Sequence, residues 1–104
     1  MVKFRSIQNR KLILDLEDRG ISFHYATKRG VYHVGRSWAS VHALLMKLNT
    51  CRKYSAVDRS LSVWMQGQAL CLRFSLRGRE EDCTFSPEET TRIMEFLGRA
   101  PNLN

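Results

Sequence analysis

At 104 residues the chain has room for one domain, spanning residues 1–104, and its 43% of hydrophobic residues excludes an intrinsically disordered protein. No run approaches the roughly 18 apolar residues of a membrane-spanning helix, and no apolar segment follows the first cations, so we expect neither a membrane anchor nor a secretory signal. The formal net charge of +7 favours a partner of the opposite sign, of which phosphate backbones are the commonest and acidic proteins the second.

The first predicted element is a helix over residues 7–19. Ser6 can cap its N-terminus, and Gly20 can supply the left-handed residue that ends it. Two short strands follow over residues 21–26 and 31–35, where apolar and polar side chains alternate. They are expected to pair as a hairpin around a basic turn.

A second helix is predicted over residues 38–49, with Ser37 as its cap and an apolar stripe that faces the core. Residues 50–59 are polar and basic, and we expect them to form a loop. Strands over residues 61–66 and 69–77 then meet at a turn that begins with glycine.

A third strand is predicted over residues 82–85. The last helix begins at Ser86, where Glu89 can complete a capping box, and it ends at Gly98. The order α-β-β-α-β-β-β-α predicts a small α+β domain whose antiparallel sheet is covered by helices on one face. Residues 61–98 are similar in layout to the arm-type DNA-binding domains of integrases, and this resemblance implies a sheet face that contacts DNA.

The positive charge is concentrated in the first half of the chain. Residues 1–52 carry ten Lys/Arg and three Asp/Glu, whereas residues 53–104 carry seven of each. No carboxylate lies between Arg19 and Val57, and the segment from Glu80 onward is acidic. We therefore expect a polarised surface, with an anionic partner on its basic side.

This basic side is expected to contact phosphates, with Trp64 available for stacking on a base. Trp64 could instead pack in a second small core, and the neighbouring arginines could pair with Glu80 or Glu81. The candidate nucleic-acid-binding residues are Lys28, Arg29, Arg36, Arg52, Lys53, Trp64, Arg73 and Arg77.

In the predicted hairpin His24 stands opposite His33, beside the basic turn. Two such imidazoles could act as general base and general acid in RNA cleavage. They could also be a pair without chemical function, and we predict no catalytic residue. No fourth ligand accompanies them and His42, and the three cysteines lack metal-ligand spacing, so we expect no metal, no cofactor and reduced thiols in a cytoplasmic protein.

Together these features predict a small nucleic-acid-binding protein that is not an enzyme, of the accessory type found in phages and mobile elements, binding DNA or RNA and able to form a homodimer. The alternative is a protein-interaction module or inhibitor that docks on an acidic partner, such as a host nucleic-acid-processing enzyme. A third hypothesis is a small ribonuclease that uses His24 and His33.

Overall fold

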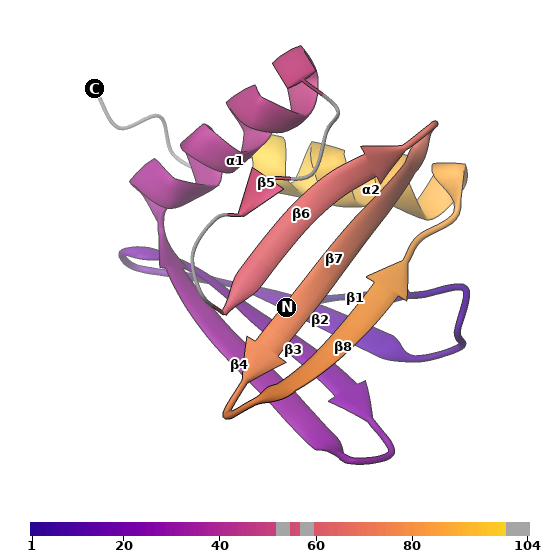
Figure 1. The fold of residues 1–104 in the computed structure, drawn as a ribbon. Coiled ribbons are helices and arrows are strands. Elements are labelled where there is room, and N and C mark those ends of the chain that lie inside the picture. Colours follow the sequence, from indigo (N-terminus) through magenta and orange to yellow (C-terminus); the bar gives the residue numbers. More distant parts are fainter. Residues whose placement is uncertain (52–54, 57–59, 100–104) are drawn as a thin grey trace.

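The first half of the chain folds into a meander of four antiparallel strands followed by a helix. The computed structural model describes residues 1–51, 55–56 and 60–99. The first sheet has the strand order β1-β2-β3-β4, and the chain continues from it directly into helix α1 (Figure 1). These elements are β1 (Val2–Arg5), β2 (Lys11–Glu17), β3 (Gly20–Thr27), β4 (Gly30–Ser37) and α1 (Trp38–Cys51).

The second half repeats this order of elements. The second sheet is also antiparallel, with the strand order β5-β6-β7-β8, and helix α2 follows it. Its elements are β5 (Ser55–Ala56), β6 (Leu61–Gln66), β7 (Ala69–Leu76), β8 (Arg79–Thr84) and α2 (Pro87–Gly98). The sequence shows no evident repeat, so the likeness between the two halves is one of topology.

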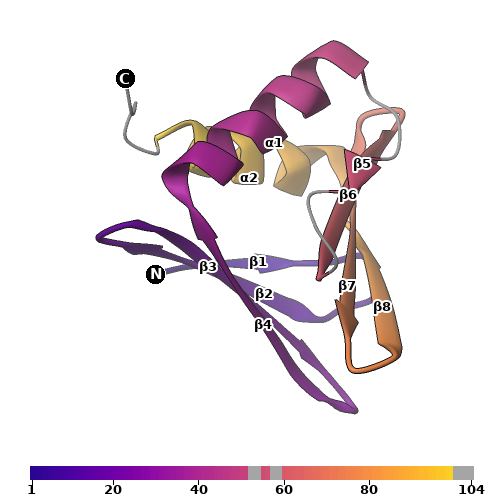
Figure 2. The ribbon, with the colours of Figure 1, turned by 60° about the vertical axis from the view of Figure 1, so that its left-hand side comes forward.

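The two sheets stand at an angle to each other, and both helices lie across the open side of that angle (Figure 2). Helix α1 packs against β3, β4 and β6, while α2 packs against β1 and β7, so each helix contacts both sheets. Between the sheets the Tyr25 ring stacks on Phe74 with the ring centroids 5.3 Å apart. The buried side chains of both sheets and both helices form one hydrophobic core.

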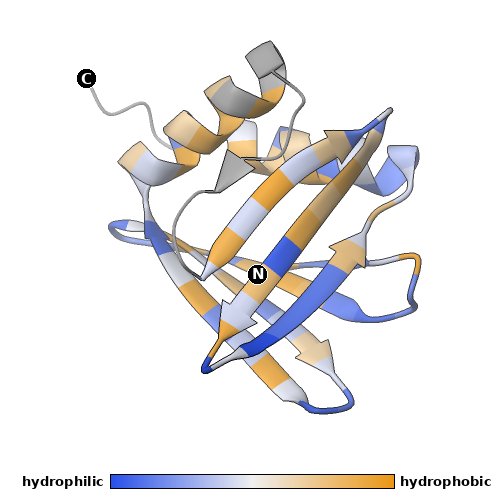
Figure 3. Ribbon diagram, viewed as in Figure 1, coloured by the Kyte–Doolittle hydropathy of each residue, from blue (hydrophilic) through white to orange (hydrophobic). Residues whose placement is uncertain are grey.

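Hydrophobic and hydrophilic residues alternate along the strands, as the hydropathy colouring shows (Figure 3). This alternation directs every second side chain into the core. The predicted hairpin of residues 21–26 and 31–35 is confirmed, with Ala26 paired with Val31. In the second sheet the predicted strands also pair across their turn, with Val63 opposite Leu72, and Gly67 at the turn has a φ of +63°. Both hairpins therefore form in the register that their sequences indicate.

The prediction of a helix over residues 7–19 is wrong. Strand β2 forms there, paired with β1 on one side and β3 on the other. Leu12 and Leu14 are buried, whereas Ile13 between them is half-buried on the opposite face. Leu12, Ile13 and Leu16 also fit a helical stripe, so the local pattern suits both periods and the neighbouring strands decide between them.

Ser6 and Gly20, the predicted ends of that helix, have other roles. Ser6 is buried in the turn between β1 and β2, where its Oγ accepts the Arg10 N–H and lies 3.2 Å from the Tyr25 hydroxyl. Gly20 begins β3, and a Cβ on it would lie 1.7 Å from the carbonyl oxygen of Arg36. The close approach of two strands, rather than a left-handed conformation, therefore requires glycine at this position.

The other two helices begin where the sequence predicts. Ser37 Oγ accepts a backbone N–H of α1 at 3.4 Å, and Ser86 Oγ accepts the N–H of Glu89 at 3.2 Å. The Glu89 carboxylate accepts the N–H of Arg5 in β1 at 2.9 Å instead of closing a capping box. Burial alone would raise the pKa of Glu89, but the hydrogen bonds from Arg5 and Arg92 outweigh it and hold this pKa below its ordinary value.

In coarse terms the domain is α+β, as predicted, but the finer arrangement differs. Two sheets enclose the core together with the helices, in place of one sheet covered on one face. Of the predicted loop 50–59, α1 extends to Cys51 and residues 55–56 form β5, while the rest lies outside the described residues. Among the described residues no helix is long and apolar enough to cross a membrane.

Candidate anion-binding site

Two hairpins that are far apart in the sequence line one pocket near the lower end of the molecule in Figure 1. One joins β3 to β4 through Lys28 and Arg29, and the other joins β7 to β8 through Arg77 and Gly78. Together they form a pocket of about 350 Å³, the tip pocket, lined by Arg29, Gly30, Val31, Tyr32, Leu76, Arg77 and Arg79. We call Lys28, Arg29, Arg77 and Arg79 the tip cluster.

The tip cluster concentrates positive charge without matching acid. All four side chains are exposed, and none of them forms an ion pair with any residue that the structure describes. An arginine presents N–H donors in a planar fork that can bind a phosphate or a carboxylate through two hydrogen bonds. An anion in the tip pocket would therefore lie among three arginines, which come from two different hairpins.

Packing beneath the pocket holds the two turns together. Tyr32 in β4 is buried, and its ring lies 6.1 Å from the ring of Phe74 in β7. Tyr32 follows Gly30 by two residues and Phe74 precedes Leu76 by two, so the contact joins the hairpins just below their turns. The rigid core thus sets the spacing of the tip cluster.

Arg77 has a backbone conformation that arginine rarely adopts. Its φ is +51°, and Gly78 follows with a φ of +79°. Two positive values define a type I′ turn, which favours Asn-Gly, and the left-handed conformation costs a residue such as arginine about 1 kcal/mol. Strain of this kind tends to occur at functional sites, and it singles out Arg77 within the tip cluster.

Replacing Arg77 with asparagine should stabilise the fold. Because asparagine suits the turn, we expect Arg77→Asn to raise the free energy of unfolding by about 0.5–1 kcal/mol, or the melting temperature by roughly 4 °C. Thermal denaturation followed by circular dichroism measures the change. Arg29→Asn is the matched control, because it removes the same charge at a residue without positive φ. An equal shift in both variants would contradict strain at Arg77.

The outer face of the first sheet, which points away from the core, is basic near the tip pocket. Two rows of side chains cross this face. One row is Lys3–Ile13–His24–His33, and the other, which lies nearer the turn between β3 and β4, is Arg5–Lys11. Val31 lies on the same face, is 61% exposed and also lines the tip pocket. Val31 therefore belongs both to the outer face of the first sheet and to the lining of the pocket.

His24 and His33 stack face to face on this surface, with ring centroids 4.2 Å apart and planes inclined by 8°. The predicted opposition of the two residues is confirmed. Rings in direct contact leave no space between them for a phosphate, which a general acid and a general base would need to flank. The geometry therefore favours a stacked pair on a basic surface over a ribonuclease site.

Arg36, one of the predicted phosphate contacts, lies apart from the tip cluster. Arg36 is half-buried, and its guanidinium donates to the Gly35 carbonyl and to Ser60 Oγ, both at 2.7 Å. These bonds give it a structural role between β4 and the residue before β6. Arg52 and Lys53 lie outside the described residues.

Trp64 and Arg73 lie on the outer face of the second sheet. The Arg73 guanidinium is 5.6 Å from the centre of the Trp64 ring and donates to both carboxylate oxygens of Asp82, at 2.7 and 3.0 Å. Glu80 adds a second carboxylate at 3.8 Å. Acidic residues therefore neutralise Arg73, and pairing of this kind was one of the alternatives that the sequence left open. Of the two arginines predicted on this strand, Arg77 alone belongs to the tip cluster.

Sequence reasoning does not select Arg79, because it lies in the electrically neutral half of the chain and precedes Glu80 and Glu81. In the structure Glu80 lies near Arg73, and Glu81 pairs with Arg10 at 3.3 Å. Both carboxylates thus have other partners, and Arg79 lines the tip pocket. The one feature of the sequence that could have indicated Arg79 as a site residue is its position beside a tight turn.

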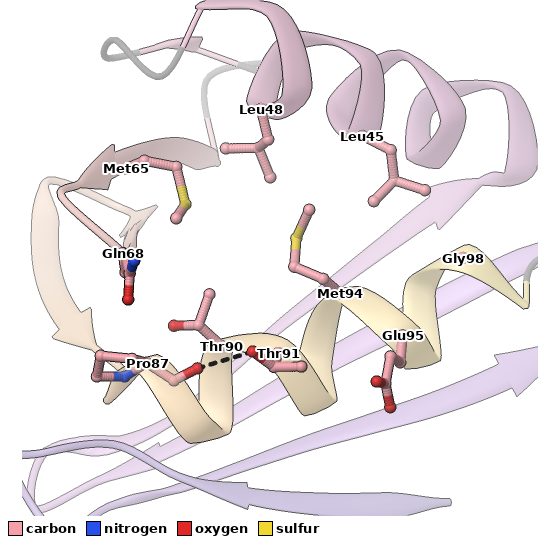
Figure 4. Close-up of a pocket in the computed structure, with 10 residues that line it drawn as sticks. All are labelled: Leu45, Leu48, Met65, Gln68, Pro87, Thr90, Thr91, Met94, Glu95 and Gly98. Carbon is pink, nitrogen blue, oxygen red and sulfur yellow. Dashed lines mark hydrogen bonds between the residues drawn. The ribbon is translucent and has the colours of Figure 1, made fainter.

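A second cavity, of about 660 Å³, lies between α1, α2 and the turn that joins β6 to β7 (Figure 4). Leu45 and Leu48 of α1 face Met65 and Met94 across it. Among the described residues that line it, Glu95 is charged and none is basic. This cavity is therefore unsuited to a phosphate.

The described residues contain no cluster of three or more potential metal ligands. Cys71 and Cys83 are buried free thiols, and burial raises the pKa of the Cys83 thiol. A thiol that stays protonated is a poor nucleophile and a poor metal ligand. Cys83 therefore does not compete with the tip cluster as a functional site.

Comparisons with protein-family models, with curated proteins and with solved structures find no match to this chain. The similarity of residues 61–98 to integrase domains stays a resemblance of layout. Function must therefore be argued from the site itself.

Proposed function

We propose that this protein binds nucleic acid through its phosphates, with the tip cluster as the principal contact. The observation that carries the proposal is the convergence of two basic turns, about fifty residues apart in sequence, on one pocket. Like charges repel each other, and an anionic partner would offset the repulsion among four cations that the core holds near one another. Phosphate matches the fork of hydrogen-bond donors that arginine presents.

The outer face of the first sheet supports a partner longer than one phosphate. Lys3, Arg5 and Lys11 project from β1 and β2 on the face that includes Val31 of the pocket. Neighbouring strands lie about 4.8 Å apart, so the distance from β4 to β1 is roughly 14 Å. A chain of phosphates can therefore follow the basic rows away from the pocket.

Removing one arginine from each turn tests this function. We expect the double variant Arg29→Gln/Arg79→Gln to bind a 20-nucleotide strand at least about tenfold more weakly than the wild type in 50 mM salt. Each of the two substitutions removes a charge-assisted hydrogen bond to phosphate. Each lost phosphate contact should also reduce the slope of log K against log salt by about 0.7–0.9. Fluorescence anisotropy at several salt concentrations measures both quantities.

The matched control is Arg19→Gln/Arg99→Gln, which removes the same charge from exposed arginines outside the tip pocket. It should weaken binding only slightly. The proposal fails if both double variants lose affinity equally, or if the wild-type protein does not bind in 50 mM salt. Single-stranded DNA, duplex DNA and RNA probes in parallel show which nucleic acid is preferred.

A second candidate function is docking of an acidic protein segment, and the edge of β4 favours it. This eight-residue strand ends the first sheet and contains no proline, one of the usual protections of a sheet edge. An extended acidic peptide could pair with it beside Lys28 and Arg29. Polyglutamate is added as a competitor of the labelled strand. If it competes as effectively as an unlabelled strand does, the result would favour this function over nucleic-acid binding.

A further inference from the structure

The shape of the tip pocket says more about its ligand than the charge alone. Three arginines line one concavity, in contrast to the open rows of cations on the first sheet. Tyr32, which is only 6% exposed, forms part of its lining and closes it toward the core. Such a pocket accommodates the end of a chain more readily than a segment that must continue in both directions.

The charge of the pocket also matches a chain end. A phosphate inside a nucleic-acid strand is a diester with one negative charge, whereas a terminal phosphate monoester carries about −1.5 to −2 at neutral pH. It also offers three oxygens as hydrogen-bond acceptors. Arg29, Arg77 and Arg79 together supply enough donors for all three oxygens.

The rim of the pocket is apolar on both sides. Val31 from the first hairpin and Leu76 from the second line it, with 61% and 44% of their surfaces exposed. Exposed aliphatic side chains beside three arginines provide a contact for the sugar or base that carries the phosphate. Inorganic phosphate would leave this rim unused.

Resting on the proposed function, we propose that the tip pocket binds the terminal phosphate of a nucleic-acid strand, and that the strand continues over the outer face of the first sheet. The terminal phosphate lies among Arg29, Arg77 and Arg79, and its nucleotide contacts Val31 and Leu76. The following phosphates reach Lys11 and Arg5, which lie in the row nearest the turn. The protein is thus a binder of phosphorylated strand ends.

The test compares three forms of one 12-nucleotide DNA strand with an internal fluorophore: 5′-phosphorylated, 3′-phosphorylated and unphosphorylated. Anisotropy titrations are expected to show one phosphorylated form binding at least about tenfold more tightly than the unphosphorylated form, and that form identifies the preferred end. In Arg29→Gln/Arg79→Gln this preference should disappear. In Lys3→Gln/Lys11→Gln, which changes the sheet and leaves the pocket intact, all forms should weaken by a similar factor and the preference should persist.

Equal affinity of the three forms, together with salt-dependent binding, would overturn the inference and leave the proposed function standing. Absence of binding by all forms would overturn both. A 5′-mononucleotide and inorganic phosphate serve as competitors, and each should compete at least about tenfold more weakly than the phosphorylated strand, because they lack contacts to the sheet. If the mononucleotide competes as well as the strand, the ligand is a free nucleotide and the assignment to strand ends is wrong.

Discussion

Phe74→Ala is expected to lower the free energy of unfolding by about 3–5 kcal/mol. Phe74 is fully buried at the junction of the two sheets, with the Tyr25 ring at 5.3 Å and the Tyr32 ring at 6.1 Å. Removing its ring leaves a cavity that both tyrosines would line. The loss is a large part of the roughly 5–15 kcal/mol that keep a domain folded.

Urea denaturation followed by far-UV circular dichroism measures this loss. Phe74→Leu is the matched control, since it retains most of the buried volume and should cost less than about 1.5 kcal/mol. A loss for Phe74→Ala no larger than that for Phe74→Leu would contradict the central position of this ring. Because the Tyr32–Phe74 contact lies directly below the tip pocket, the alanine variant should also weaken nucleic-acid binding under conditions where it remains folded.

Gly20→Ala is expected to cost about 3 kcal/mol or more. The new Cβ would lie 1.7 Å from the carbonyl oxygen of Arg36 and 2.9 Å from the Cα of Ser37. These are backbone atoms, which cannot move aside as a flexible side chain would. The end of the β3–β4 pairing must therefore open, together with the nearby bond from the Trp38 N–H to the Arg19 carbonyl, which measures 3.2 Å.

Gly35→Ala is the matched control for this variant. Gly35 lies in the same hairpin, without a positive φ, and a Cβ there would have no atom within 4 Å. We expect its effect on stability to stay within about 0.5 kcal/mol. If thermal or urea denaturation shows the two alanine variants to be equally stable, this result contradicts the close approach of Gly20 to the carbonyl oxygen of Arg36.

Local sequence was sufficient for the two central hairpins. Side chains alternate along β3 and β4 and along β6 and β7, and a slip by one residue would turn every apolar side chain to the wrong face. Tight turns, such as the one that begins at Gly67, fix where the pairing starts. The starts of α1 and α2 were predictable for a similar reason, since the caps Ser37 and Ser86 act within four residues.

Local sequence was insufficient where two periods fitted the same residues. Leu12, Ile13 and Leu16 fit a helix, whereas Leu12, Leu14 and Leu16 fit a strand. Strand β2 forms because β1 and β3 pair with its two edges and the second sheet helps to enclose its apolar face. The hydropathy pattern of ten consecutive residues does not show which other strands will pair with them.

By itself the sequence determined the α+β class, the hairpin registers and the separation of a basic first half from an acidic end, because these depend on residues that are close in the chain or on composition. The tertiary structure decided which cations form a site. It brings Arg29 beside Arg77 and Arg79, and it neutralises Arg73 through Asp82. The tip cluster depends on the packing of two hairpins through Tyr32 and Phe74, which no local pattern encodes. The polarised charge was therefore predictable, whereas the pocket that gathers it was not.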